Sequence, residues 1–121
     1  MRNCIGFKKD GWFSPAVEAK GLVFISGQGP VGPAGGDEPS DTFEGQVRQT
    51  FENLIYVIDK AGYSINDVVK INAYLSDISN FHKFNQVYLK YIPEPRPART
   101  TVQTILVNGA QCEIDCVLLA H

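Results

Sequence analysis

One arginine stands where it could do chemistry. Arg99 follows Pro97 and Ala98 and begins the run RTTVQTIL, whose β-branched residues are typical of a strand. Its planar guanidinium keeps its charge at working pH and matches a carboxylate through two parallel hydrogen bonds. Arg99 therefore predicts a site for a small acid. The alternative is that its stem packs on the rim of a sheet while its head meets solvent or an internal Asp or Glu.

Three further residues could complete such a site. Asn85 has Phe81 and Tyr88 as helical neighbours, so it lies within or beside an apolar stripe and needs hydrogen-bond partners. It either ties a loop to its helix or contacts a ligand. Ser26 ends a predicted strand in ISGQGP, and Gly27 after it lets the backbone approach a ligand closely.

Glu113 interrupts the apolar run CEIDCVLLA, where a carboxylate costs free energy unless it is paired or functional. Asn108 and Gly109 predict a hairpin between the last two strands. A two-residue loop would direct Arg99 and Glu113 to opposite faces, whereas a three-residue loop with a glycine bulge would direct both to one face. We predict the bulged arrangement, or a Glu113 that reaches the site from another angle.

Neither metal nor cofactor sites are indicated. His82 and His121 are isolated, one on a predicted helix surface and one at the terminus. Cys112 and Cys116 lie about 13 Å apart on one strand, too far for a disulfide, and we interpret them as buried small hydrophobes. The glycines of 27–36 lack the spacing of a P-loop or a dinucleotide fingerprint.

Composition indicates one domain, residues 1–121. The chain is 44% hydrophobic and 20% charged, with a net charge of -2, so it should fold alone and has no broad attraction for nucleic acid or anionic lipid. No apolar stretch has the length of a signal peptide or a membrane span. Because three cysteines without paired spacing suit a reducing compartment, a cytoplasmic location is predicted.

Hydrophobic periodicity predicts the elements that hold these residues. In chain order they are a hairpin over 16–27 turning at Lys20 and Gly21, a loop over 27–41, a helix over 43–61, a strand over 67–77, a helix over 81–92, and strands over 98–106 and 111–119. The strand over 67–77 should bury alternate residues, namely Val69, Ile71, Ala73 and Leu75.

Several residues predict where the helices begin and end. Asp41 and Glu44 form a plausible capping box for the first helix, and Gly62 ends it. Ser79 is placed to cap the second helix, and Pro93 stops it.

The order ββαβαββ indicates an α+β fold with one mixed sheet and two helices on one face. Two helices cannot cover both faces of such a sheet, yet the final strand is apolar on both. Large exposed apolar patches are uncommon on soluble monomers. We therefore expect a homo-oligomer in which the uncovered sheet faces pack together.

The segments ISGQGP, VVKINAYLSDISNF, FNQVYLKY, PARTTVQT and CEID, in this order across about 90 residues, resemble the RidA family, also called YjgF or L-PSP proteins. The resemblance covers nearly the whole chain. It implies a chorismate-mutase-like fold assembled as a barrel-like homotrimer, with sheets inside, helices outside and ligand clefts between subunits.

The resemblance also implies an activity without a cofactor. Family members hydrolyse reactive enamine and imine acids, such as 2-aminoacrylate and 2-iminopropionate, to 2-keto acids and ammonia. The family arginine matches Arg99, which would hold the substrate carboxylate, and the late-strand glutamate matches Glu113, which would orient or deprotonate a water. The family serine and asparagine match Ser26 and Asn85.

Other positions qualify the resemblance. Backbone groups beside Gly27 and Thr101 are further expected substrate contacts. Many deaminating members have a tyrosine where this chain has Phe13 and a cysteine where it has Thr101. Phe13 lacks a phenolic hydroxyl, which points to an altered substrate preference or a lower rate. Two alternatives remain: a non-catalytic trimer that binds small carboxylates, and an endoribonuclease, a name that some relatives carry.

Overall fold

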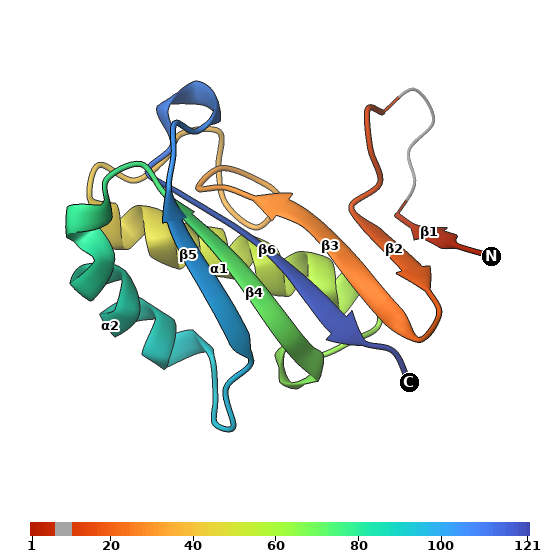
Figure 1. Cartoon of the computed structure of the whole chain (residues 1–121). Helices are drawn as coiled ribbons and strands as arrows, with labels where there is room; N and C mark the ends of the chain where they lie inside the picture. Colours follow the sequence, from red (N-terminus) through yellow and green to blue (C-terminus); the bar gives the residue numbers. More distant parts are fainter. Residues whose placement is uncertain (7–10) are drawn as a thin grey trace.

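The computed structural model describes residues 1–6 and 11–121, which form one sheet with two long helices (Figure 1). The elements are β1 (Asn3–Ile5), β2 (Ala16–Ala19), β3 (Leu22–Gln28), α1 (Phe43–Lys60), β4 (Val68–Leu75), α2 (Phe81–Tyr91), β5 (Ala98–Gln103) and β6 (Cys112–Leu119). Short 3-10 turns cover Ile65–Asp67, Ile78–Asn80 and Val107–Gly109.

The six strands are ordered β1-β2-β3-β6-β4-β5. The α+β class with a mixed sheet is confirmed, because β4 and β5 are parallel and the other neighbours antiparallel. The predicted order lacked β1, which is too short to show a periodicity. The predicted hairpin of the last two strands is wrong, because β4 lies between β5 and β6 and pairs with both. The segment at Asn108 forms a 3-10 turn with Asn108 at φ 56°, and no hairpin.

In Figure 1 α1 passes behind the sheet and α2 lies beside β5, packed against α1 through Phe84 and Phe51, so one face of the sheet is covered and the other is open. The covered face is the hydrophobic core, in which β6 contributes every second residue. Its fully buried large side chains include Phe51, Leu54 and Ile58 of α1, Phe84 of α2, Ile71 and Leu75 of β4, and Ile114 and Leu118 of β6. Burial of such side chains stabilises the fold by about 1.5–3 kcal/mol each.

The first hairpin forms as its sequence predicts. Lys20 and Gly21 have φ values of 54° and 81°, the left-handed conformations that a tight two-residue turn requires. β2 and β3 therefore pair from Ala19 with Leu22 to Ala16 with Ile25.

The helix ends are partly as predicted. Gly62, at φ 88°, follows the end of α1, as expected. The N-cap of α1 is Thr42, whose hydroxyl accepts from the backbone of Gly45, and the predicted Asp41 box is wrong by one residue. Ser79 does not cap α2 either, because it lies inside a 3-10 turn that precedes the helix.

Alternation along β4 holds for Ile71, Ala73 and Leu75, which are buried. Val69 was predicted to be buried with them but is 43% exposed. The register of β4 against β6 shifts between Val68 and Lys70, so the bulge buries Val68 in place of Val69. None of the helices in residues 1–6 and 11–121 is long and apolar enough to span a membrane.

Candidate functional site

Arg99 lies on the covered face, between β5 and α2. It pairs with the fully buried Ile71 in parallel register, so both side chains point toward the helices. Its guanidinium carbon is 4.6 Å from the ring centre of Tyr88, 5.4 Å from that of Phe84 and 5.5 Å from that of Phe81. Three ring faces thus hold the cation in one position, and each cation–π contact contributes about 0.5–2 kcal/mol.

This position bears on one part of the alternative interpretation of Arg99, an internal ion pair. Across the described ranges, no aspartate or glutamate forms an ion pair with it. Arg96 behaves differently, since its Nη1 atom lies 3.0 Å from Oε1 of Glu94 at the surface. Arg99 therefore holds a fixed positive charge, with its hydrogen-bond donors available to an anion.

Two buried oxygens near Arg99 also lack partners. Thr101 follows Arg99 by two residues and shares its face of β5, and Asn85 lies one helical turn from Phe81 on α2. Oγ1 of Thr101 and Oδ1 of Asn85 are both buried without a hydrogen-bond partner in the described structure. An unsatisfied buried polar atom costs about 1–3 kcal/mol of folding free energy. The two oxygens therefore indicate a place where a hydrogen-bond donor from a ligand could bind.

Glu113 lies on the open face, opposite to Arg99. It pairs with Tyr74, whereas Arg99 and Cys116 both pair with Ile71 on the covered face. The prediction that Arg99 and Glu113 share a face is wrong, because it assumed a β5–β6 ladder that does not form. Within one chain, the arginine and the glutamate do not converge.

The Glu113 carboxylate rests against the backbone of Gly27. A Cβ atom added to Gly27 would lie 2.5 Å from Oε2 and 3.0 Å from Cδ of Glu113. The glycine is therefore needed for the glutamate's position. Burial, and then the negative charge of Asp115, raise the pKa of Glu113 above its usual value, which makes the carboxylate a stronger base.

Ser26 holds a neighbouring loop. Its hydroxyl donates to the carbonyl of Ser14 at 2.7 Å, and its backbone nitrogen donates to the carbonyl of Pro15 at 2.9 Å. These bonds position Trp12 and Phe13, which are 96% and 68% exposed. Trp12 and Phe13 thus form an exposed apolar patch at this loop.

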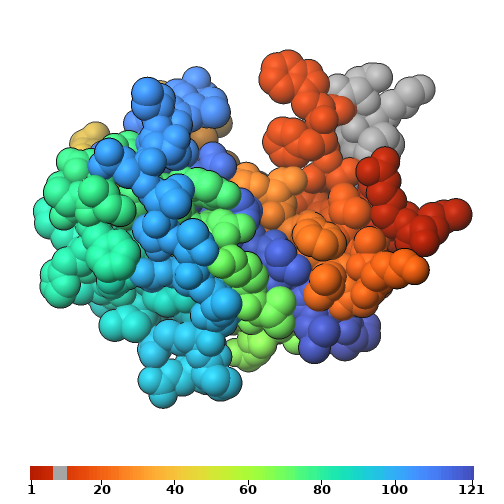
Figure 2. Space-filling model, viewed as in Figure 1, coloured from red at the N-terminus to blue at the C-terminus, as the bar shows by residue number. Residues whose placement is uncertain are grey.

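The open face is hollowed between two ridges. Figure 2 shows one ridge formed by the orange-red segment before β2 and another by the blue segment after β5. The second ridge carries Ile105, which is 97% exposed. The Glu113 half of the site thus lies on the face where apolar side chains are uncovered.

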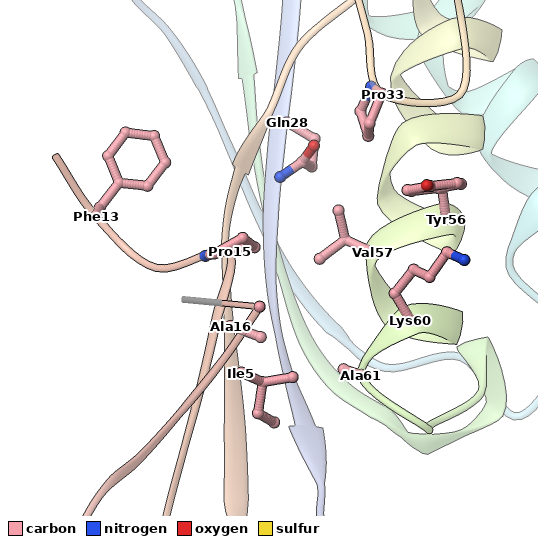
Figure 3. Close-up of a pocket in the computed structure, with 11 residues that line it drawn as sticks. Ile5, Phe13, Pro15, Ala16, Gln28, Pro33, Tyr56, Val57, Lys60 and Ala61 are labelled. Carbon is pink, nitrogen blue, oxygen red and sulfur yellow. The ribbon is translucent and has the colours of Figure 1, made fainter. Parts of the chain in front are cut away.

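A separate cavity of about 520 Å³ lies on the covered face (Figure 3). It separates Ile5 and Ala16 from Val57 and Lys60 of α1, and Phe13 is the one predicted site residue in its wall. Because β1 and β2 are at the opposite edge of the sheet from β5, this cavity is not the site of Arg99.

The thiols do not form a reactive centre. Cys112 and Cys116 are buried, as expected for small hydrophobes, and burial raises the pKa of each thiol to about 12. A thiol with such a pKa is not ionised at neutral pH and is a poor nucleophile. The described residues contain no group of three His, Cys, Asp or Glu side chains arranged to hold a metal.

Sequence reasoning missed the roles of two groups. Phe81 and Tyr88 were noted only as neighbours of Asn85 in an apolar stripe. Together with Phe84, they are aromatic residues at helical spacing opposite a strand with an arginine, which is a usable signal. Tyr74 and Asp115 were not singled out, yet the tyrosine hydroxyl donates to the aspartate at 2.8 Å beside Glu113. Nothing in a single strand's pattern reveals such a cross-strand bond.

Comparison with known proteins extends over almost the whole chain. A family profile described as Endoribonuclease L-PSP matches residues 7–120. A RutC family protein of Pyrococcus horikoshii is 41% identical over 111 residues, which cover 91% of this chain and 88% of that protein. The chloroplastic Reactive Intermediate Deaminase A of Arabidopsis thaliana is 36% identical over 108 residues, 88% of this chain and 58% of that protein. The crystal structure of Escherichia coli TdcF with bound serine superposes with a TM-score of 0.82 at 30% identity, covering 92% of this chain and 90% of that one.

Proposed function

Because the chain belongs to the RidA/YjgF/L-PSP family, we propose that it hydrolyses reactive 2-imino acids and their enamine tautomers, such as 2-iminopropionate and 2-aminoacrylate, to 2-keto acids and ammonia. The observation that carries the proposal is Arg99, a caged cation without an acidic partner in the described structure, beside two unsatisfied oxygens. The related plant protein named Reactive Intermediate Deaminase A supports the reaction class, and the serine bound to TdcF supports a small amino-acid-like ligand.

The two halves of the proposed site come from two copies of the chain. Arg99, Thr101 and Asn85 make one half on the covered face, whereas Glu113 and Gly27 make the other on the open face. One chain cannot bring both halves to one small substrate. A homotrimer, as the family resemblance implies, would bury the open faces and join the halves at each seam.

In the proposed reaction Arg99 binds the substrate carboxylate and fixes the C=N carbon toward a water molecule. Oxygen of that water bonds to the carbon as the C=N π bond opens, Glu113 takes a proton from the water, and it passes this proton to the imine nitrogen to give a carbinolamine. Glu113 then takes the hydroxyl proton and delivers it to the amine nitrogen, so that the carbon–nitrogen bond breaks, the carbonyl forms, and the keto acid and ammonia are released with the carboxylate regenerated. Asn85 Oδ1 and Thr101 Oγ1 are available to accept hydrogen bonds from the substrate nitrogen.

The direct test is turnover of 2-iminopropionate made in place by an amino-acid oxidase. The wild-type chain should remove the imine faster than buffer does, and Glu113→Gln should retain affinity for 2-ketobutyrate while losing most of the rate. A wild-type rate equal to that of buffer, across several imino acids, would falsify the proposal.

Mixing variants tests the two-copy site. Neither Arg99→Ala nor Glu113→Gln alone should be active, but co-refolded mixtures should recover part of the activity, because some seams then join an intact arginine to an intact glutamate. A mixture as inactive as its components would show that both groups act from the same copy.

Phe13 supports a second candidate, a non-catalytic trimer that binds small carboxylates. Its ring offers no hydroxyl to a substrate, and carboxylate binding needs only Arg99. Binding of 2-ketobutyrate without acceleration of imine loss would favour this candidate.

A third candidate, an endoribonuclease, has the description of the matching profile in its favour. The net charge of -2 opposes it, because RNA binding depends on cationic surfaces. RNA cleavage that persists through purification and disappears in Arg99→Ala would favour it over the deaminase.

A further inference from the structure

A polar network crosses β4 and β6 on the open face. Asp115 accepts a hydrogen bond at each carboxylate oxygen, from Nδ2 of Asn72 at 2.8 Å and from the hydroxyl of Tyr74 at 2.8 Å. Asn72 is the direct cross-strand partner of Asp115, whereas Tyr74 is the partner of Glu113 and reaches diagonally. The network therefore holds Asp115 from two positions and fixes its side chain.

The diagonal bond leaves Glu113 free. Tyr74 is the residue directly opposite Glu113, but its hydroxyl is taken by Asp115. The bond to Asp115 is the largest factor that raises the pKa of Tyr74 to about 12, so the phenol stays protonated and remains a donor. In the described part of the chain, no side chain or backbone group donates a hydrogen bond to the Glu113 carboxylate.

Asp115 is the charged neighbour that acts on Glu113. The two residues are separated by one position on β6 and point to the same face, about 6–7 Å apart along the strand. Within the described part of one chain, Tyr74 on β4 is the other titratable group facing Glu113, and β3 presents the uncharged Gly27. In the proposed two-copy site, Arg99 of a neighbouring copy also faces Glu113, with its charge engaged by the substrate carboxylate. Neither acid has an ion-pair partner among residues 1–6 and 11–121, so the negative charge of Asp115 is not neutralised nearby.

We propose that Asp115, held by Asn72 and Tyr74, is a positioning residue for the proposed hydrolysis, which keeps Glu113 free of competing donors and makes it a better base toward water. The catalytic role of Asp115 rests on the proposed function, whereas the effect of its charge on Glu113 does not. Burial and the Asp115 charge both raise the pKa of Glu113, and general bases work best when their pKa lies near the working pH.

The test combines a direct titration with kinetics on the full-length protein. The Glu113 carboxyl signal, assigned by its loss in Glu113→Gln, is followed by carbon NMR over pH. The pH at the midpoint of the Glu113 titration should be lower in Asp115→Asn than in the wild type, because the neighbouring negative charge is removed. It should not fall in Tyr74→Phe, which keeps the charge and removes only a donor to it. Asp59→Asn removes a charge from the exposed surface of α1 and should leave the midpoint unchanged.

Kinetic measurements distinguish a positioning role of Asp115 from a general loss of structure in the variant. Asp115→Asn should lower kcat by roughly three- to tenfold and move the acidic limb of the pH–rate profile to lower pH, with KM unchanged because Arg99 still binds the acid. An equal Glu113 midpoint in wild type and Asp115→Asn would overturn the inference even in an active enzyme. A lower midpoint in a protein with no imine hydrolysis would support the electrostatic coupling and reject the proposed function alone.

Discussion

Two asparagines on the two long helices differ in whether the fold satisfies their side chains. Asn53 of α1 is fully buried, and its Oδ1 accepts from the backbone nitrogen of Ala34 at 3.0 Å. Its Nδ2 donates to the carbonyls of Gly29 at 2.8 Å and Val31 at 3.0 Å. Asn53 thereby ties the glycine-rich loop to α1. Asn85 of α2 has a buried Oδ1 that no described residue satisfies.

The surroundings of the two residues differ in the same way. Around α1 the buried polar groups are paired, since Thr50 donates to the carbonyl of Gln46 at 2.8 Å and Gln46 accepts from the backbone of Gln111 at 3.1 Å. Around α2 and β5, Thr101 Oγ1 and Arg99 have no polar partner among residues 1–6 and 11–121. Buried polar groups that pair within the chain maintain the fold, whereas unpaired ones need an explanation, which the proposed function supplies as a ligand. One interpretation of Asn85 was that it ties a loop to its helix. In the structure, Asn53 makes such a connection.

The largest expected effect is at the arginine. Arg99→Ala should weaken 2-ketobutyrate binding and imine turnover by about 2–5 kcal/mol, because a desolvated carboxylate loses its bidentate partner. This corresponds to a loss of roughly 30-fold to several thousand-fold in titration calorimetry or kcat/KM. Arg96→Ala is the matched control, since its ion pair with Glu94 is at the surface and contributes about 1 kcal/mol or less. Equal small effects of the two substitutions would contradict the assignment.

The asparagine comparison can be tested by unfolding. Asn53→Ala should lower the free energy of unfolding by about 2–4 kcal/mol in urea titrations, because it leaves the loop groups at Gly29, Val31 and Ala34 unpaired. Asn85→Ala should change stability by less than about 1 kcal/mol, since its Oδ1 loses no partner, but should weaken ligand binding. If Asn85→Ala proves the more destabilising change, the distinction between the two regions fails.

The glutamate half can be displaced without being removed. Gly27→Ala should push the Glu113 carboxylate aside and reduce kcat by about tenfold to a hundredfold, as misplaced catalytic groups do. Gly29→Ala is the control, because a Cβ atom there meets nothing within 4 Å and should leave kcat unchanged. Comparable rates in both variants would mean that the position of Glu113 is unimportant for turnover.

The smallest effect is expected from Thr101→Val. Replacing a buried hydroxyl that has no partner in the described ranges should stabilise the free protein by about 1 kcal/mol, or about 3–6 °C in Tm by calorimetry. The same change should weaken ligand binding. Thr50→Val, which removes a hydroxyl that donates to the carbonyl of Gln46, should lower Tm. A lower Tm in both variants would indicate that Thr101 has a structural partner.

Local patterns predicted most of the elements. The turn at Lys20 and Gly21, the end of α1 at Gly62 and the buried alternation of Ile71 and Ala73 each depend on neighbouring residues, and each is confirmed. The exposed Val69 was not predictable, because a bulge arises from pairing with β6 and leaves no mark in the strand itself.

The candidate site was predictable as a set of residue types, and its division between two faces was not. Arg99 and Glu113 stood out because a charge within an apolar strand has a free-energy cost that requires a reason. Their faces depend on which strands are neighbours. The hairpin rule favoured β5 beside β6, but β4 pairs with both, and this reversed the predicted arrangement.

The sequence by itself determined the class of fold, which follows from periodicity and turn chemistry, and the family, which follows from the order of the resembling segments. It also supplied the candidate residues for holding an acid, which follow from side-chain type. Only the tertiary structure decided which polar atoms stay unpaired and which acids influence one another, because these are properties of cross-strand and helix–strand neighbours that lie tens of residues apart. Asp115 and Tyr74, separated by 41 positions and joined by one hydrogen bond of 2.8 Å, are the clearest instance.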